Sequence, residues 1–245
     1  MKPRLLDLFC GAGGATQGYQ RAGFYVVGVD IRPQPHYCGD EFYQADAMTF
    51  PMDIMDTFMV IHASPPCQAF TPLRKGLWKD RKHPDLVAET RERLLNFGGR
   101  FVIENVPGAP LIRPILLCGT MFRLRAQSAE LRRHRLFECH GFDLGLIPPC
   151  AHNCYGRKVP TKGKDGTDRY WPATVEVYGN GGGSSKRDSR QMFPHRDRAE
   201  AMGIDWMNGD ELSEAIPPAY TEFIGRQLMQ ALERAGCVLT LERTT

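Results

Sequence analysis

"DLFCGAGG" at residues 7–14 is the stretch that decides the expected fold. It ends the apolar run "RLLDLF" and precedes "ATQGYQRAG", so its glycines lie between a predicted strand and a predicted helix. Glycine lets a backbone approach a ligand closely. The third glycine of a GxGxxG pattern is Thr16 here, so a nucleotide-like ligand without a pyrophosphate is favoured over a dinucleotide. An ordinary structural turn is the alternative to a cofactor site.

The chain around this stretch alternates apolar runs with helical or turn signals. Strands are predicted near residues 4–9, 25–30, 58–62 and 99–106. A βαβ rhythm of this kind predicts an α/β fold with a mostly parallel sheet. The strands then end together, at Cys10, Asp30, Ala63 and Glu104. Ligands of open parallel sheets bind outside this edge, and Asp30 occupies the place where a carboxylate binds ribose hydroxyls.

A cysteine lies at this edge in "ASPPCQAFT", residues 63–71. The two prolines before Cys67 restrict the backbone and hold the sulfur in one place. A buried, inert thiol is the usual fate of an isolated cysteine. Glu104 in "ENV", at the end of a later strand, adds a carboxyl group on the same edge, and the pair suggests catalysis. A helix N-cap region or a surface ion pair is the alternative for Glu104.

Two further groups carry charge or metal ligands. In "LRRHRLFE" at 131–138, Arg133 and Arg135 share a face if the segment is extended, although a solvated charge run is the alternative. A possible zinc site consists of Cys139, Cys150, His152 and Cys154. Its spacing is not that of a standard knuckle, so we favour unliganded cysteines and predict no metal, with zinc left open.

After residue 136 the sequence predicts loops, with "TVEV" as the only clear strand. Helices are predicted in "HRDRAEAMGIDW" and in "PPAYTEFIGRQLMQALERAG". The expected division is a cofactor-binding catalytic domain of residues 1–136 and 199–245, and a small lobe of residues 137–198. No signal peptide or membrane-spanning run is visible, and eight cysteines lack a disulfide framework, so a cytoplasmic protein without membrane contact is expected.

The charge distribution favours a nucleic-acid partner. The whole chain of 245 residues has a net charge of only +3. Residues 157–198, however, carry ten Lys or Arg against five Asp or Glu. Aromatic residues accompany this basic segment, at Tyr155, Tyr170, Trp171, Tyr178 and Phe193. Phosphates and stacked bases would suit it, and a solvated loop is the alternative.

Taken together, the motifs resemble those of the DNA (cytosine-5) methyltransferases, in the family's order and over most of the chain. "DLFCGAGG" is similar to the first cofactor motif, "PPCQAFT" to the nucleophile motif and "ENV" to the glutamate motif. "RRHR" resembles the paired-arginine motif and "EAIPPAYTEFIGRQL" the last cofactor-side motif. The resemblance implies a class I, Rossmann-like methyltransferase fold whose small lobe recognises the target.

By this resemblance the cofactor is S-adenosylmethionine. Phe9 and Ile31 would flank its adenine, and Asp46 would bind the adenine amino group. Gly11 and Gly13 would admit the methionine portion. Asp30 would hold the ribose hydroxyls.

The resemblance also implies the chemistry. The Cys67 thiolate would add to C6 of cytosine while Glu104 supplies a proton or hydrogen bond at N3, which makes C5 nucleophilic enough to take a methyl group. Arg133 and Arg135 would steady the O2 side and the thiolate. The substrate would be double-stranded DNA with the base flipped out. The basic segment 71–83 would close over the DNA as a lid.

The chain departs from the family at two positions. Leu131 replaces a glutamine before the arginines, and Glu214 replaces an asparagine near the cofactor. The recognition segment is short, which predicts a short or relaxed target. The chain is expected to be a monomeric, phage-like enzyme whose role is to protect DNA from restriction. The alternatives are a transfer-RNA methyltransferase, a catalytically silent DNA-binding relative and an NAD-linked dehydrogenase.

Overall fold

The protein is described by a computed structural model, over residues 2–70, 84–152, 158–162, 167–172, 174–177 and 193–237. Its main feature is a seven-stranded sheet of order β3-β2-β1-β4-β5-β9-β6. These strands are β1 (Arg4–Leu8), β2 (Tyr25–Asp30), β3 (Glu41–Gln44), β4 (Val60–Ala63), β5 (Arg100–Asn105), β6 (Ile115–Leu117) and β9 (Arg135–His140). The first five neighbours pair in parallel, and β9 runs antiparallel to both β5 and β6. The predicted α/β fold with a mostly parallel sheet is confirmed.

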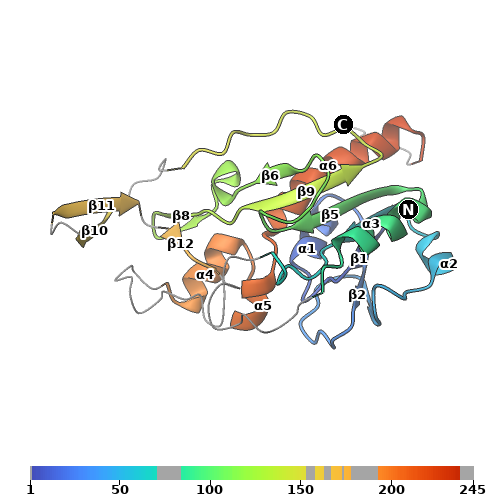
Figure 1. Cartoon of the computed structure of the whole chain (residues 1–245), viewed down its shortest axis with the longest axis horizontal. Coiled ribbons are helices and arrows are strands. Elements are labelled where there is room, and N and C mark those ends of the chain that lie inside the picture. Colours follow the sequence, from blue (N-terminus) through green and yellow to red (C-terminus); the bar gives the residue numbers. More distant parts are fainter. Residues whose placement is uncertain are drawn as a thin grey trace, which may run out of the picture.

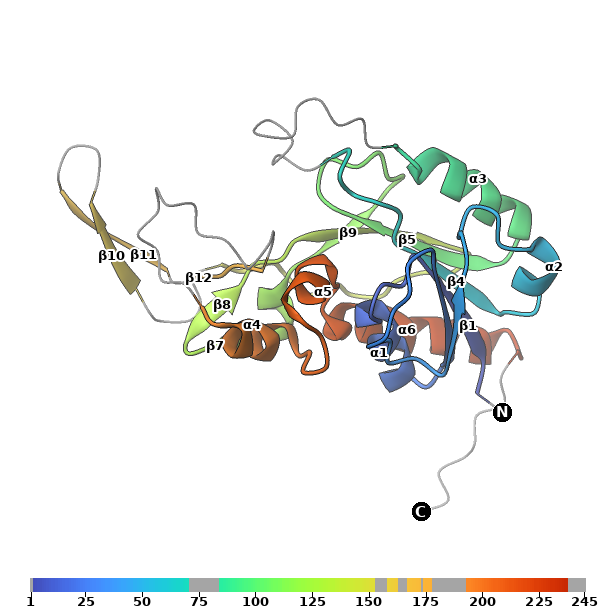
Figure 2. The same cartoon turned by 90° about the horizontal axis from the view of Figure 1, so that it is seen from below.

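Helices cover both faces of this sheet (Figures 1 and 2). They are α1 (Gly14–Arg21), α2 (Met52–Met55), α3 (Val87–Phe97) and α6 (Pro218–Arg234). The core on one face includes Tyr19 of α1 and Leu228 of α6, and the core on the other includes Met55 of α2 and Leu94 of α3. Because both faces are buried, the central strands appear in the sequence as apolar runs. Helices α1 and α6 confirm the predictions in "ATQGYQRAG" and "PPAYTEFIGRQLMQALERAG", and the helix predicted in "HRDRAEAMGIDW" covers only residues 195–202.

A smaller layer extends from one end of the sheet (Figure 1). It contains the turn η2 (Gly119–Phe122), the sheet β12-β8-β7, the hairpin β10-β11, and helices α4 (His195–Met202) and α5 (Gly209–Glu214). The strand bounds are Arg125–Ala126 for β7, Ala129–Leu131 for β8, Lys158–Lys162 for β10, Asp168–Pro172 for β11 and Thr174–Val175 for β12. A separate core lies here, with Leu131, Val175 and Met202 among its buried residues.

The prediction of a single strand after residue 136 is wrong. Strand β9 continues to His140 inside the main sheet, and β10 and β11 form a hairpin. β9 was missed because its sequence "RLFECH" looks polar. Its Glu138 is nevertheless buried, since it forms an ion pair with Arg91 at 2.8 Å. The division into residues 1–136 with 199–245 and 137–198 stays a prediction, and β9 crosses its first boundary.

Among the described residues, no helix combines the length and the apolar character that a bilayer-spanning segment requires.

Candidate active site at the carboxyl edge of the sheet

The glycine loop that follows β1 has an unusual backbone. Phe9, Gly11 and Gly13 have φ angles of 59°, 49° and 91°. A left-handed non-glycine residue such as Phe9 is strained, and such strain concentrates at functional sites. A Cβ atom added at Gly11 would meet no atom within 4 Å, whereas one at Gly13 would lie 2.7 Å from Cys38 Sγ. Gly11 therefore faces open space that a ligand can enter, and Gly13 packs against the protein.

Asp30 holds this loop in place from the end of β2. Its carboxylate accepts hydrogen bonds from the backbone N–H groups of Gly11 at 3.0 Å and Arg32 at 2.9 Å. The side chain is almost buried, which limits the water that competes for it. The predicted ribose-binding carboxylate thus lies beside the glycine loop.

The other predicted cofactor residues lie at the ends of neighbouring strands. Phe9 follows β1, Ile31 follows β2 and Asp46 follows β3, and these three strands are adjacent in the sheet. The Ile31 side chain is 65% exposed, which leaves its apolar surface available to a ring. Asp46 is exposed and accepts a hydrogen bond from the Met48 N–H at 2.9 Å.

Glu214, which was expected near the cofactor, forms an ion pair with Arg32. Arg32 Nη2 lies 2.8 Å from Glu214 Oε2, and both side chains are largely exposed. A second contact, between His36 Nδ1 and Glu211 Oε1 at 2.9 Å, joins the same two segments. Together they attach α5 to the segment that follows β2. No sequence spacing indicates the Arg32 contact, because its partner is 182 residues away.

Cys67, Glu104 and Arg135 form the second half of the site. Cys67 lies on a turn after β4 and is half-buried, and Glu104 is buried near the end of β5. Arg135 Nε, at the start of β9, lies 3.0 Å from Glu104 Oε1. Burial raises the pKa of the Cys67 thiol, and so does the Glu104 charge, whereas the Arg135 and Arg133 charges lower it. The structure thus brings the predicted thiol and carboxyl into one electrostatic environment.

Opposing effects act on the Glu104 carboxyl. Burial raises its pKa, while Arg135, a hydrogen bond from Ser64 and Arg133 lower it. Behind Ser64 lies a chain of hydrogen bonds, from His62 Nε2 to Ser64 Oγ at 2.9 Å and from Tyr19 OH to His62 Nδ1 at 2.9 Å. Complete burial lowers the pKa of His62 to about 3, so its ring is neutral near pH 7.

A neutral His62 fixes the direction of this chain, because one ring nitrogen donates and the other accepts. Ser64 uses its single proton on Glu104, so its oxygen accepts from His62 Nε2–H. His62 Nδ1 then accepts from the Tyr19 hydroxyl. The sequence analysis missed this relay, although a histidine inside the apolar run "MVIHA" was a possible signal.

The two predicted arginines have different contacts. Arg133 is buried, and its guanidinium donates to the carbonyls of Ala215 at 3.0 Å, Ser213 at 2.6 Å and Val177. Burial and the nearby Arg135 lower its pKa to about 9. Arg135 instead contacts Glu104. Arg133 therefore joins separate backbone segments, whereas Arg135 reaches the reacting groups.

Several predicted features have other outcomes. Phe193 was expected near bases, but this is wrong, because it is buried in the core of the smaller layer. The lid at 71–83, Tyr155, Tyr178 and Cys154 lie outside the described residues, as do the side chains of Tyr170 and Trp171. Of the possible zinc ligands, Cys150 and His152 meet at 3.1 Å, whereas Cys139 packs against the core.

Comparisons with known proteins bear on the fold. No protein-family model and no curated protein sequence matches this chain. Similar solved structures include a putative DNA modification methyltransferase encoded within an E. coli prophage, at 16% identity over 95% of this chain and 100% of that chain, with a TM-score of 0.58. The S. pombe Dnmt2 methyltransferase has 15% identity, coverage of 96% and 99%, and a TM-score of 0.58. The Entamoeba histolytica methyltransferase EhMeth has 13% identity over 96% of this chain and 99% of that chain, with a TM-score of 0.55.

These likenesses extend over nearly the whole of each chain, while the identities are low. They agree with the strand order and the helices on both faces of the sheet. This chain therefore has the Rossmann-like α/β fold of these methyltransferases.

Proposed function

We propose that this chain is an S-adenosylmethionine-dependent DNA cytosine C5-methyltransferase. The observation that carries the proposal is the ion pair of Glu104 with Arg135, whose charges both act on the Cys67 thiol, at the sheet edge that also carries the open glycine loop. A half-buried thiol beside a buried acid and a guanidinium suits addition of sulfur to a protonatable ring. The fold shared with known methyltransferases supports the same assignment.

The residues around the glycine loop fit the proposed cofactor. Gly11 leaves the space that a methionine portion requires, and Gly13 shapes the turn. Each Asp30 oxygen accepts one backbone hydrogen bond, and a carboxylate oxygen has capacity for a second, which ribose hydroxyls would supply. Phe9 and Ile31 would contact the adenine ring. Exposed Asp46 would accept from the adenine amino group.

Bound S-adenosylmethionine would supply an electrophilic methyl group, and the protein must make C5 of cytosine able to attack it. The Cys67 thiolate forms a bond to C6, and Glu104 gives its proton to N3, so electron density moves to C5. C5 would then take the methyl group from the sulfonium, which leaves as a neutral thioether. The C5 proton would pass to solvent water, the N3 proton would return to Glu104, and the Cys67 sulfur would leave C6 as a thiolate, so the ring becomes aromatic again.

Glu104 is suited to hold this proton. Burial favours its neutral form, while Arg135 and Ser64 favour the carboxylate that remains after transfer. Burial is the larger effect, so the pKa of Glu104 is raised, which favours the protonated acid that the reaction requires. Arg135 would also stabilise the thiolate, and Arg133 would act on the same groups through its charge.

The target base must leave the duplex to reach Cys67, at a cost of a few kcal/mol that protein contacts offset. The basic segment 71–83 would bind the DNA backbone, and the small lobe would recognise the target sequence. Protection of phage-like DNA from restriction is the proposed role. A monomer would be sufficient for this reaction.

Radiolabelled methyl transfer tests the proposal. Purified protein, labelled S-adenosylmethionine and either duplex DNA or transfer RNA are combined, and label is expected in DNA. The Cys67→Ala variant should transfer nothing, whereas the matched Cys237→Ser variant, which changes an exposed cysteine, should match wild type. Label in transfer RNA alone would overturn the DNA assignment, and label in neither would favour a silent relative.

A trapping experiment tests the covalent step itself. Duplex DNA that contains 5-fluorocytosine lacks the C5 proton whose loss releases the enzyme, so a Cys67 adduct should accumulate. Mass spectrometry of tryptic peptides should locate it on Cys67. An adduct on another cysteine would contradict the assigned nucleophile. Bisulfite sequencing of DNA from expressing cells would then give the target sequence.

A further inference from the structure

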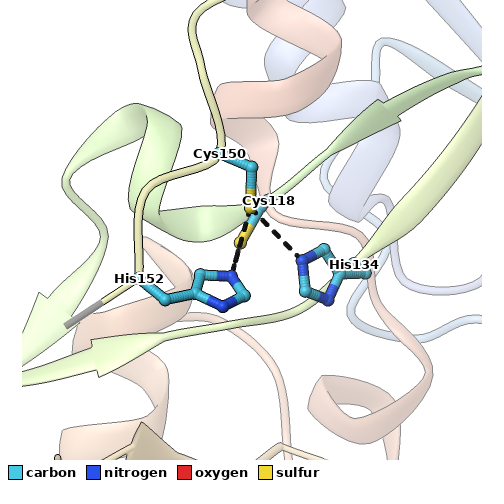
Figure 3. A group of neighbouring side chains, drawn as sticks. All are labelled: Cys118, His134, Cys150 and His152. Carbon is cyan, nitrogen blue, oxygen red and sulfur yellow. Dashed lines mark hydrogen bonds between the residues drawn. The ribbon is translucent and has the colours of Figure 1, made fainter.

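Four side chains with metal-binding atoms gather outside the candidate active site. This Cys–His cluster consists of Cys118, His134, Cys150 and His152. One ligand atom of each lies within 4.8 Å of the others. Figure 3 shows the thiols and imidazoles turned toward a common centre. They come from three segments: the residue after β6, the residue before β9, and the stretch that follows β9.

The distances in the cluster agree with a tetrahedral site. With Zn–S bonds of about 2.3 Å and Zn–N bonds of about 2.0 Å, neighbouring sulfur and nitrogen ligands lie about 3.5 Å apart. The three measured S···N distances are 3.5 Å for Cys118 to His152, 3.4 Å for Cys150 to His134 and 3.1 Å for Cys150 to His152. The imidazole rings of His134 and His152 lie 5.1 Å apart at an angle of 50°. Only small movements would bring all four atoms onto one ion.

We propose that the Cys–His cluster binds a structural zinc ion. Two thiolates and two imidazoles form a donor set that selects zinc over magnesium or calcium, which prefer oxygen ligands. Four protein ligands fill a tetrahedral coordination shell and leave no position for a substrate. The site is therefore structural and separate from the methyl-transfer chemistry.

The surroundings of Cys118 support a thiolate ligand. Cys118 is fully buried, and the Thr120 hydroxyl donates to its sulfur at 3.3 Å. A hydrogen bond of this kind orients a ligand and stabilises its charge. Cys150 is exposed and His152 is partly exposed, so an ion can enter from the solvent side.

The ion would hold together segments that have little other regular structure. Residues 141–152 contain no helix or strand, and Leu146 is 98% exposed. Cys150 and His152 would attach this stretch to the sheet through Cys118. His134 lies between Arg133 and Arg135, so the ion would also fix the segment that positions both arginines. The site would thus act on the proposed reaction only through position.

The Cys–His cluster differs from the set of zinc ligands that the sequence suggested. Cys150 and His152 remain, but Cys139 packs against the core beside β5 instead. The other two members of the cluster are Cys118 and His134. Cys118 lies 16 positions before His134, and His134 lies 16 positions before Cys150. Such distant ligands leave no short motif in the sequence.

Metal content provides the direct test, because it does not depend on activity or substrate. Full-length protein purified in reducing buffer with zinc should contain about one zinc ion per chain by inductively coupled plasma mass spectrometry. Cys150→Ser and His152→Ala should lose most of it. The matched variants Cys237→Ser and His195→Ala change exposed residues outside the cluster and should keep it.

Cobalt substitution identifies the ligands without any mutation, so the test survives if a variant fails to fold. Cobalt bound by two thiolates and two imidazoles should show intense tetrahedral d–d bands and a thiolate charge-transfer band. Octahedral spectra, or wild-type protein that stays metal-free in excess zinc, would overturn the proposal. Loss of zinc in Cys139→Ser with retention in His134→Ala would overturn the ligand set. A disulfide between Cys118 and Cys150 under reducing conditions would do so too.

Discussion

Cys67 and Cys118 both follow strands of the main sheet, yet their neighbours differ in kind. Cys67 is half-buried among charged groups, with Glu104 and Arg135 acting on its thiol. Cys118 is fully buried at a cluster of sulfur and imidazole groups that contains no carboxylate. The first arrangement adjusts the reactivity of a sulfur that must form and break a bond. The second directs several lone pairs at one point, which suits a permanent ligand.

The largest expected effect separates these two cysteines. Cys67→Ala should lower methyl transfer by at least about 10³-fold because it removes the nucleophile, and should leave zinc content unchanged. Cys118→Ala should remove the zinc and lower the thermal midpoint while retaining measurable methyl transfer. Parallel assays of label transfer and metal content would show this. Equal losses of zinc in the two variants would contradict the separate roles assigned to Cys67 and Cys118.

Glu104→Gln should give opposite results in two measurements. Methyl transfer should fall by about 10²–10³-fold, because the amide cannot give a proton to N3. The Glu104 charge raises the pKa of Cys67, so its removal should lower that pKa and speed alkylation of Cys67 by iodoacetamide near pH 7. Alkylation of exposed Cys237 is the internal control. Slower modification of Cys67 in the variant would contradict the electrostatic coupling.

Two buried groups in the main sheet should have opposite effects on how the free energy of unfolding changes with pH. Asp7 and His62 lie opposite each other on β1 and β4. Burial raises the pKa of Asp7 to about 7, so its contribution to stability falls as pH rises from about 4 to 7. Burial lowers the pKa of His62 to about 3, so its contribution rises with pH from about 3 to 6.5. In the wild type the two largely cancel.

Asp7→Asn should expose the His62 contribution. At about 1.4 kcal/mol per pKa unit, the free energy of unfolding should rise by on the order of 3 kcal/mol between pH 4 and 6.5. Urea titrations at several pH values would measure it, with wild type as the flat reference. The same profile in both proteins would show that Asp7 ionises normally.

A smaller effect is expected from Ser64→Ala. The Ser64 hydrogen bond lowers the pKa of Glu104, so its loss should raise that pKa. If protonated Glu104 is the active form, methyl transfer will then persist to higher pH, with a few-fold gain over wild type at the alkaline limb. Rate profiles against pH would detect the shift. A shift toward lower pH would mean that the hydroxyl does not act on Glu104.

The smallest effect concerns the exposed pair between Arg32 and Glu214. Glu214→Asn removes one partner of the pair, and exposed ion pairs contribute only about 0–1 kcal/mol. Binding of S-adenosylmethionine, measured by calorimetry, should change by less than about fivefold. A larger change would assign Glu214 a direct part in the cofactor site. Zinc content again serves as the unaffected reference.

The sequence predicted the elements whose signals are local. Apolar runs identified β1, β2, β4 and β5, because strands buried on both faces need apolar side chains throughout. Their common direction also placed Cys67 and Glu104 on one edge. The β9 strand escaped because Arg135 and Glu138 are charged, and only their partners, Glu104 and Arg91, make burial possible.

The remaining features depend on contacts between distant segments. The chain of hydrogen bonds behind Glu104 includes Tyr19, which lies 43 residues from its partner His62. The Cys–His cluster combines residues up to 34 positions apart, and Cys118 and His134 have no neighbouring ligands in the sequence. Local patterns therefore predict where strands end, whereas tertiary packing decides which side chains meet there.

The contacts of Arg133 have a consequence for how mutations in this chain should be interpreted. Its guanidinium spans three carbonyls, on Val177, Ser213 and Ala215, so one side chain joins segments that are far apart in the chain. Lysine has a single terminal nitrogen and cannot reproduce this fork. An inactive Arg133 variant would thus combine a detached C-terminal segment with the loss of a charge that acts on Cys67 and Glu104. Of the two arginines, only Arg135 offers a substitution whose effect can be attributed to the reacting groups.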